Sequence, residues 1–323
     1  MLPILKFNCY FKPVIWGGER IAKFKGIPSQ GDNIGESWEL SPMPGHESVV
    51  EDGPFKGATL PELVKTHGDE LMGENLIRRF GHNFPLLIKF IDSNTDLSIQ
   101  VHPDDALAAV RHNSLGKTEM WYSVLPAEGA YLYAGFSQEM SPEKFRRMVA
   151  DSTIVEALRK YYTKPGDVFF LPAGRVHAIG AGNFVLEIQE ASDITYRIYD
   201  YDRRDAQGNL RQLHVDESVD AINYADTTQE VKNVQAAPGH EAMLEDCSYF
   251  TTELVNVDGS FTLALAVRKS FTILIATRGN LEAVAPDGAV TPLPQGQTLL
   301  VPASMPSVTV RGNGEFVNVH IRN

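Results

Sequence analysis

The feature that most constrains the fold is a succession of short strand-like segments after about residue 85, each bounded by turn-forming residues. The segments are apolar or alternate apolar with polar residues, and many of their side chains are β-branched or aromatic, which is typical of strands. They cover residues 85–91, 97–101, 120–125, 130–134, 167–171, 184–189 and 195–199. Short strands at this spacing favour a mainly β protein, built as a sandwich or a barrel.

A second strand-rich block covers residues 249–323 and follows a polar stretch at residues 225–240. Its strand-like segments are residues 271–277, 279–285, 297–302 and 316–321, with Gly, Pro and Asp between them. A chain of 323 residues is long enough for about two domains. We therefore expect a larger unit over residues 1–240 and a smaller C-terminal β unit over residues 241–323.

Helices are expected at only a few places. Thr59 can cap a helix whose first turn contains Pro61 and Glu62, and a shorter helix is expected around residues 75–80. Residues 141–144 form a capping-type start, followed by apolar residues at helical spacing. This pattern predicts a small helical insertion at about residues 141–162.

The net charge and the positions of the cysteines argue against some classes of partner and cofactor. With 29 Lys and Arg against 41 Asp and Glu, the net charge is 29 − 41 = −12, which disfavours a nucleic-acid partner. The cysteines, Cys9 and Cys247, are far apart and form no disulfide or metal framework. Lys6 and Lys12 interrupt the apolar N-terminal segment, and no apolar run is long enough to span a bilayer. We expect a cytoplasmic protein with no membrane partner, and its oligomeric state is left open.

Three segments carry residues suited to chemistry. In residues 98–103, the strand period of two places Ser98, Gln100 and His102 on one face. Lys117 and Glu119 share a face where the next strand begins, and the turn after residues 167–171 presents His177. Two imidazoles and a carboxylate are common ligands of a divalent cation, and the amide of Gln100 can supply a fourth donor. The set suits zinc, although manganese, iron or cobalt could bind it.

These segments resemble those of type I phosphomannose isomerases, zinc enzymes of the cupin superfamily. The resemblance includes residues 98–103, 116–119 and 165–177. It extends to residues 16–18 and 36–38 near the N-terminus, and to Glu187, residues 191–193 and Arg197. It covers most of residues 10–205 in the order found in the family, and it is to the shorter bacterial form.

The resemblance implies a fold, an activity and a set of site residues. It implies two cupin-type β-barrel or jelly-roll units, of which residues 1–240 are catalytic, and one Zn²⁺ per chain. Under it the ligands are Gln100, His102, Glu119 and His177, and the active site is lined by Lys117, Glu187, Asp193 and Arg197. Ser98, Trp16 and Glu36 are candidates for contacts to the substrate. The implied substrate is a sugar phosphate.

The implied reaction interconverts mannose 6-phosphate and fructose 6-phosphate by moving a proton between C2 and C1 through an enediolate. Lys117 and Arg197 can hold the phosphate or the enediolate oxygens, and Arg197 suits bidentate oxygen recognition. Glu187, Asp193 and Lys117 are candidates for the general base. Two alternatives use similar residues: a cupin oxygenase that depends on a metal, and a sugar-phosphate-binding cupin without enzymatic activity.

The C-terminal block repeats part of the catalytic pattern. Residues 296–307 parallel residues 166–177, with Ser307 at the position of His177. Because serine replaces this ligand, we expect the C-terminal unit to bind no metal. Its expected role is structural, either shielding a sheet edge or forming a subunit contact.

Overall fold

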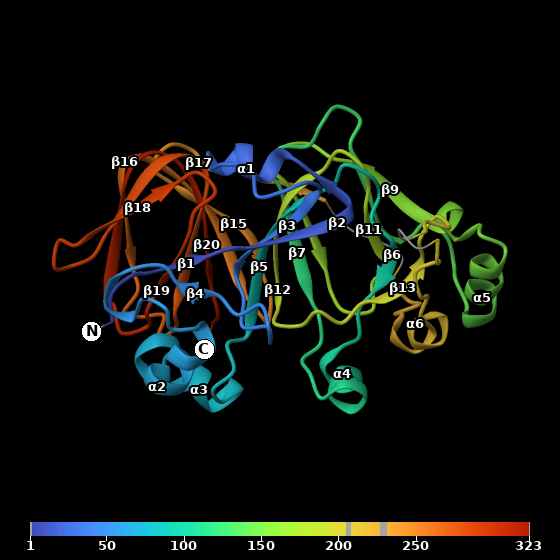
Figure 1. Cartoon of the computed structure of the whole chain (residues 1–323), viewed down its shortest axis with the longest axis horizontal. Helices are drawn as coiled ribbons and strands as arrows, with labels where there is room; N and C mark the ends of the chain where they lie inside the picture. Colours follow the sequence, from blue (N-terminus) through green and yellow to red (C-terminus); the bar gives the residue numbers. More distant parts are fainter. Residues whose placement is uncertain (1, 205–207, 227–230, 323) are drawn as a thin grey trace.

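The computed structural model describes residues 2–204, 208–226 and 231–322, and the chain is mainly β with antiparallel strand pairing. Strands form three sheets (Figure 1). The predicted mainly β fold is therefore confirmed. Over the described ranges, none of the helices has both the length and the apolar character needed to cross a membrane.

The strand order of each sheet mixes segments that are distant in sequence. The seven-stranded sheet runs β14 (Lys232–Asn233), β10 (Asp167–Leu171), β7 (Glu119–Ser123), β12 (Phe184–Glu190), β5 (Leu86–Asp92), β3 (Ile34–Leu40) and β2 (Tyr10–Gly18). The five-stranded sheet runs β13 (Tyr196–Tyr199), β6 (Ile99–Val101), β11 (His177–Ile179), β8 (Tyr131–Phe136) and β9 (Leu158–Tyr162). The eight-stranded sheet runs β15 (Glu241–Asp246), β16 (Thr251–Ala264), β20 (Ser307–His320), β17 (Thr272–Val284), β19 (Thr298–Val301), β1 (Leu5–Asn8) and β4 (Val49–Val50), and β18 (Val290–Pro294) pairs with β17.

The seven-stranded sheet lies between the other two, so its central strands are buried on both faces (Figure 1). Ile91 and Val185 belong to an apolar core shared with the five-stranded sheet. Ile88 and Leu186, at alternate positions, belong to the core shared with the eight-stranded sheet. Burial on both faces explains why residues 85–91 and 184–189 read as nearly continuous apolar runs. Charged side chains in these strands therefore need partners.

Helices lie at the periphery of the sheets (Figure 1). They are α1 (Arg20–Lys25), α2 (Leu60–Met72), α3 (Glu74–Phe80), α4 (Asp105–His112), α5 (Pro142–Ala150) and α6 (Val215–Ala221), with 3₁₀ turns at Gly53–Phe55 and Ile154–Ala157. The predicted cap of α2 is confirmed, because Thr59 and Glu62 form a reciprocal capping box. Helices α1, α4 and α6 were not predicted from the sequence.

The helical prediction for residues 141–162 is wrong in its last part. Residues 142–150 are helical as expected, but Leu158–Tyr162 form β9 and pair with β8. The side chains of β9 alternate between less and more exposed positions, a period of two that matches a strand at the edge of a sheet. Packing on β8 decides the structure of this segment.

Two further findings concern the C-terminal sheet. The segments expected at residues 271–277 and 279–285 form one continuous strand, β17, whose register against β20 shifts between Ala276 and Arg278. Near the N-terminus, β1 pairs with β19 and β4. The first strand of the chain is therefore part of the sheet that residues 241–323 mostly build.

Candidate active site

The four predicted donor residues converge from two facing sheets. Gln100 lies on β6 and His177 begins β11, and the two are direct partners across the five-stranded sheet. His102 follows the end of β6 by one residue, and Glu119 begins β7 in the seven-stranded sheet. His102, Glu119 and His177 are each at most 1% exposed. The space between the two sheets therefore holds a buried cluster of potential ligands.

Hydrogen bonds orient both imidazoles toward the centre of this cluster. Nδ1 of His102 donates to the carbonyl oxygen of Ile194 at 2.9 Å, and Nδ1 of His177 donates to that of Arg175 at 2.8 Å. With the proton on Nδ1, each Nε2 presents a lone pair. Burial lowers the pKa of His177 to about 3, and burial together with Lys117 lowers the pKa of His102 well below its usual value. Both rings are therefore neutral, as metal ligands must be.

The spacing of the donor atoms fits a cation. The two Nε2 atoms lie 3.2 Å apart, and they lie 3.5 and 3.4 Å from the oxygens of Glu119. A tetrahedral zinc ion with bonds of about 2.0–2.1 Å separates its ligand atoms by about 3.3–3.4 Å. Two imidazole lone pairs facing each other at this distance repel, and a cation between them removes that repulsion. These three residues fit a divalent metal.

Gln100 and Lys117 border the same cluster. The amide nitrogen of Gln100 lies 3.3 Å from Nε2 of His177, and the opposite amide orientation would place its oxygen there. Nζ of Lys117 lies 2.9 Å from Nε2 of His102 and 2.7 Å from Glu119. A positive charge is thus already present beside two of the donors. Burial raises the pKa of Glu119, and the neighbouring Lys117 opposes this shift.

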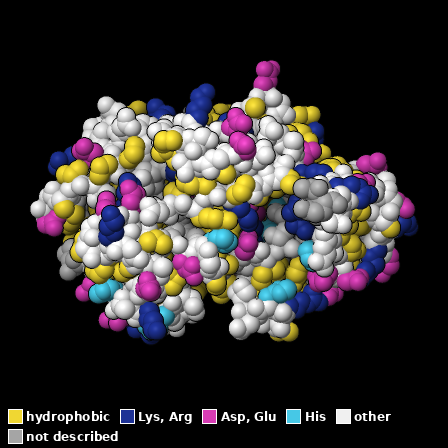
Figure 2. Space-filling view, viewed as in Figure 1, with side chains coloured by type: hydrophobic (Ala, Val, Ile, Leu, Met, Phe, Trp, Pro, Cys, Tyr) yellow, Lys and Arg dark blue, Asp and Glu magenta, His cyan; other side chains and the backbone are white. Residues whose placement is uncertain are grey.

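A cavity of about 260 Å³ opens beside the cluster. Figure 2 shows the surface hollowed right of centre, with Lys and Arg side chains gathered beside the hollow. The predicted site residues that line the cavity are Trp16, Glu36, Ser98, Gln100, Lys117, Glu187, Asp193 and Arg197. His102, Glu119 and His177 lie behind Gln100 and Lys117 and do not line it. The structure therefore brings together all eleven predicted site residues.

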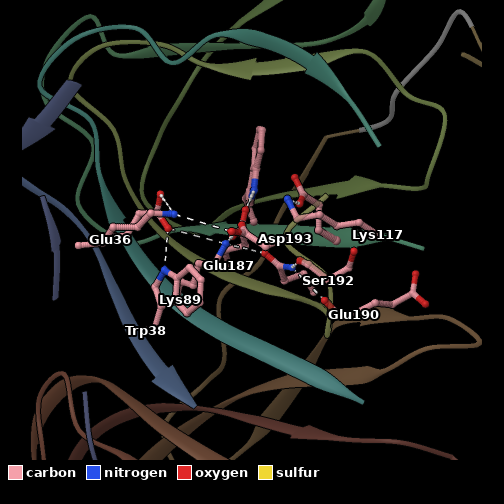
Figure 3. A network of polar contacts seen from close by, with 12 residues as sticks. Glu36, Trp38, Lys89, Lys117, Glu187, Glu190, Ser192 and Asp193 are labelled. Carbon is pink, nitrogen blue, oxygen red and sulfur yellow. Dashed lines mark hydrogen bonds and ion pairs between the residues drawn. The ribbon is translucent and has the colours of Figure 1, made fainter. Parts of the chain in front are cut away.

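A buried network centred on Lys89 forms one wall of the cavity (Figure 3). Nζ of Lys89 lies 3.0 Å from Glu187 and 3.9 Å from Glu36. Nε1 of Trp121 donates to Glu187 at 2.9 Å, and Nε1 of Trp38 donates to Glu36 at 2.7 Å. Burial alone would lower the pKa of Lys89, but the two carboxylates outweigh it and raise that pKa. Conversely, Lys89 and Lys117 overcome the effect of burial and lower the pKa of Glu187.

Three cationic side chains of this site were not predicted from the sequence. Lys89 lies in β5, a strand buried on both faces, and a lysine inside such an apolar run was a signal that could have been used. Lys12 lies at the rim, 3.8 Å from Glu36 and 3.9 Å from Asp193. Arg211 follows β13 in an irregular segment and lines the cavity with no strand pattern to mark it.

Two arginines that line the cavity, Arg197 and Arg211, lie close to each other and to Arg203. Nη1 of Arg197 donates to the carbonyl oxygen of Gln212 at 2.9 Å, while its Nε has no hydrogen-bond partner among the described residues. Arg211 donates to the buried carboxylate of Asp200 at 3.3 Å, and Arg203 also pairs with that carboxylate. Burial and the nearby guanidinium of Arg211 lower the pKa of Arg197. Several positive charges in so small a volume favour an anionic ligand.

The fold and the site together define a cupin-type protein with a buried cluster of potential metal ligands beside a cavity lined with cations. The chain belongs to the type I phosphomannose isomerase family. Residues 4–122 match the family described as "Phosphomannose isomerase type I, catalytic domain", and residues 240–321 match "Mannose-6-phosphate isomerase, cupin domain". The family resemblance seen in the sequence is therefore confirmed.

Similar proteins match over nearly the whole chain. The mannose-6-phosphate isomerase ManA of Bacillus subtilis is 37% identical over 98% of both chains. A mannose-6-phosphate isomerase of Streptococcus mutans is 35% identical over 95% of this chain and 94% of its own. The crystal structure of the mannose 6-phosphate isomerase from Bacillus subtilis superposes with a TM-score of 0.90, at 33% identity, over 98% of this chain and 99% of that one.

Proposed function

We propose that this chain interconverts mannose 6-phosphate and fructose 6-phosphate, with one Zn²⁺ bound by His102, Glu119, His177 and Gln100. The observation that carries the proposal is the placement of a buried donor cluster directly beside a cavity lined with cations. The donor spacing and the neutral imidazoles support a divalent ion. When bound, such an ion supplies a Lewis acid next to the sugar oxygens.

We assign the substrate phosphate to Arg197 and Arg211. Both side chains line the cavity, and Arg211 is close enough to Arg197 to lower its pKa. Guanidinium forks match the geometry of phosphate oxygens. Lys117 is a less suitable phosphate ligand because its Nζ contacts His102 and Glu119. Ser98, Trp16 and Glu36 line the remaining walls and are assigned to contacts with the sugar.

We assign proton transfer between C2 and C1 to Lys117, which acts as the base after its ammonium group has released a proton to solvent. The lowered pKa of Glu187 makes its carboxylate a weak base, and its role is to fix Lys89 and Trp121 in the wall of the cavity. The side chain of Asp193 is 47% exposed at the rim, where Lys12 is its ion-pair partner. Of the three candidates, Lys117 has its Nζ 2.9 Å from His102 and 2.7 Å from Glu119, two members of the donor cluster, where the proposed ion would hold the sugar oxygens. Arg197 then supplies positive charge to the phosphate.

The domain assignment is part of this proposal. Residues 1–240 carry every residue assigned to catalysis, and residues 241–323 form the bulk of a second β unit. The pairing of β1 with β19 ties the first residues of the chain to that second unit.

A coupled isomerase assay on mannose 6-phosphate tests the function. We expect turnover that a chelator abolishes and added Zn²⁺ restores, and we expect His102→Ala to reduce activity to background. Substrate-dependent oxygen uptake would indicate the oxygenase alternative. Calorimetric binding of sugar phosphate without turnover would indicate a binding protein.

A further inference from the structure

The orientation of His177 depends on a single backbone carbonyl. Its Nδ1 donates to the carbonyl oxygen of Arg175, two residues earlier, in the loop that joins β10 to β11. That hydrogen bond fixes the ring rotation and the tautomer, and so determines where Nε2 points. Whatever holds the backbone of Arg175 in place therefore also holds His177.

The side chain of Arg175 anchors this loop. Its Nε and Nη2 donate to the two carboxylate oxygens of Asp226, with the Nη2 contact at 2.7 Å, and its Nη1 donates to the carbonyl oxygen of Phe170 at 2.7 Å. The side chains of Arg175 and Asp226 are only 11% and 13% exposed. A bidentate pair with an additional backbone contact is geometrically specific, because one rigid fork satisfies three acceptors at once.

The residues after α6 hold the same loop at a second point. The backbone N–H of Asn223 donates to the carbonyl oxygen of Gly174 at 2.9 Å, and the N–H of Gly174 donates to the carbonyl oxygen of His102 at 2.9 Å. The segment that contains Asn223 and Asp226 is thus connected through Gly174 to the backbone of His102, and through Arg175 to the carbonyl that holds the ring of His177. Asp226 lies in the polar stretch of residues 225–240, whose sequence predicts no role.

The C-terminal unit gives an independent comparison. Residues 296–307 parallel residues 166–177, and Ser307 begins β20 as His177 begins β11. At the position of Arg175 this unit has Met305, which is 1% exposed and packs in the apolar core of the eight-stranded sheet. The histidine and the arginine are replaced in the same copy of the pattern.

We propose that Arg175 and Asp226 are positioning residues for the metal centre, which they stabilise by holding the carbonyl that orients His177. The proposal rests on the proposed function, because it takes His177 as a metal ligand. Residues that orient ligating histidines typically contribute about 10- to 100-fold to metal affinity. We expect a contribution of about that size here.

The test measures the dissociation constant of Zn²⁺ by chelator competition on the full chain. The variants are Arg175→Met, which introduces the residue of the C-terminal copy, and Asp226→Asn, which keeps the shape but removes the charge. Asp216→Asn is the matched control, because Asp216 of α6 pairs with Arg146 of α5 at the surface, away from the cluster. His177→Ala reports the loss of the ligand itself. Thermal unfolding of each metal-free variant shows whether it folds.

We expect Arg175→Met and Asp226→Asn to raise the Zn²⁺ dissociation constant about tenfold or more, with kcat recovering at saturating Zn²⁺ and the control unchanged. The positioning role would be overturned if Arg175→Met and Asp226→Asn both fold and have Zn²⁺ dissociation constants within twofold of the wild type, while His177→Ala binds Zn²⁺ weakly. An unchanged dissociation constant in His177→Ala would instead contradict the proposed function. If Arg175→Met does not fold, the Zn²⁺ dissociation constant of Asp226→Asn alone is compared with the wild type, with the same twofold limit.

Discussion

Lys89 shows how one residue can place a functional charge inside an apolar strand. It is 4% exposed, yet it stays protonated because Glu187 and Glu36 are close. The free energy of burying such a charge is offset only while its partners remain. The charged wall of the cavity is therefore also a determinant of stability.

Glu187→Gln should destabilise the fold, because Lys89 then keeps the neutral amide oxygen of Gln189 and the more distant carboxylate of Glu36 but loses its closest carboxylate. Removing one partner of a buried pair typically costs about 3–5 kcal/mol, and the remaining Glu36 favours the lower end. Denaturant unfolding measures the change. Glu74→Gln, which breaks a surface pair with Arg78, serves as the control and should have little effect. Equal stability of Glu187→Gln and the wild type would contradict the role given to this ion pair.

Arg211→Gln should weaken the binding of the sugar phosphate more than it slows catalysis. The phosphate does not change during the reaction, so its contacts contribute equally to the ground state and the transition state. Losing one hydrogen bond between charged groups, about 1.5–3 kcal/mol, should raise KM about 10- to 100-fold and leave kcat nearly unchanged.

Steady-state kinetics on mannose 6-phosphate test this prediction. Arg204→Gln is the matched control, because Arg204 is exposed on the same irregular segment and donates to the carbonyl oxygen of Gly208. An unchanged KM in Arg211→Gln would place the phosphate elsewhere in the cavity.

Individual elements could be predicted where local chemistry determined them. The cap of α2 is such a case, because Thr59, Pro61 and Glu62 are adjacent in sequence and need no distant partner. Residues 158–162 are the opposite case, because their strand conformation depends on β8. Short peripheral helices such as α4 were missed because they have few turns and so only a weak apolar period.

Thr59→Ala should destabilise the protein by about 1 kcal/mol, since the N-cap oxygen that accepts from the backbone of Glu62 is lost. Thr66→Ala, the same substitution on the exposed face of α2, is the control and should be neutral or slightly stabilising, because alanine has the higher helix propensity. Chemical denaturation of both variants measures the difference. Equal effects of the two substitutions would show that the cap does not stabilise α2.

At the scale of the whole molecule, three sheets stack, and the seven-stranded sheet in the middle contributes side chains to two hydrophobic cores. One of its faces carries Glu119 of the cluster of potential ligands, and its other face packs against the C-terminal unit. Met120, next to Glu119, receives a hydrogen bond from Thr252 of β16 at its sulfur, at 3.0 Å. The C-terminal unit therefore supports the strand that carries the carboxylate of the cluster.

The buried His320 should make global stability depend on pH. Burial lowers its pKa to about 4, below about 6.5 in the unfolded chain. Between these values the unfolded state binds the extra proton, so the free energy of unfolding falls as the pH decreases from about 6.5 to about 4. The shift corresponds to at most about 3.5 kcal/mol.

Denaturant unfolding of the wild type and of His320→Gln over pH 4–7.5 tests this effect. The difference between the two proteins should be constant above pH 7, where the histidine is neutral in both states, and should shift in favour of the variant on acidification. A difference that does not change with pH would contradict the prediction. Changes common to both proteins, including protonation of the metal ligands, cancel in the comparison.

The sequence by itself determined the strand-rich class and the cap of α2, and it predicted the four donor residues that the structure brings together, because period-two patterning and donor chemistry are local properties. Only the tertiary structure decided which cations face the cavity, that β9 is a strand and that β1 joins the C-terminal sheet. Lys89, Arg211 and Asp226 form ion pairs with residues that are not their neighbours in the sequence, namely Glu187, Asp200 and Arg175. Such pairings depend on how distant strands and loops pack, and no local periodicity encodes that packing.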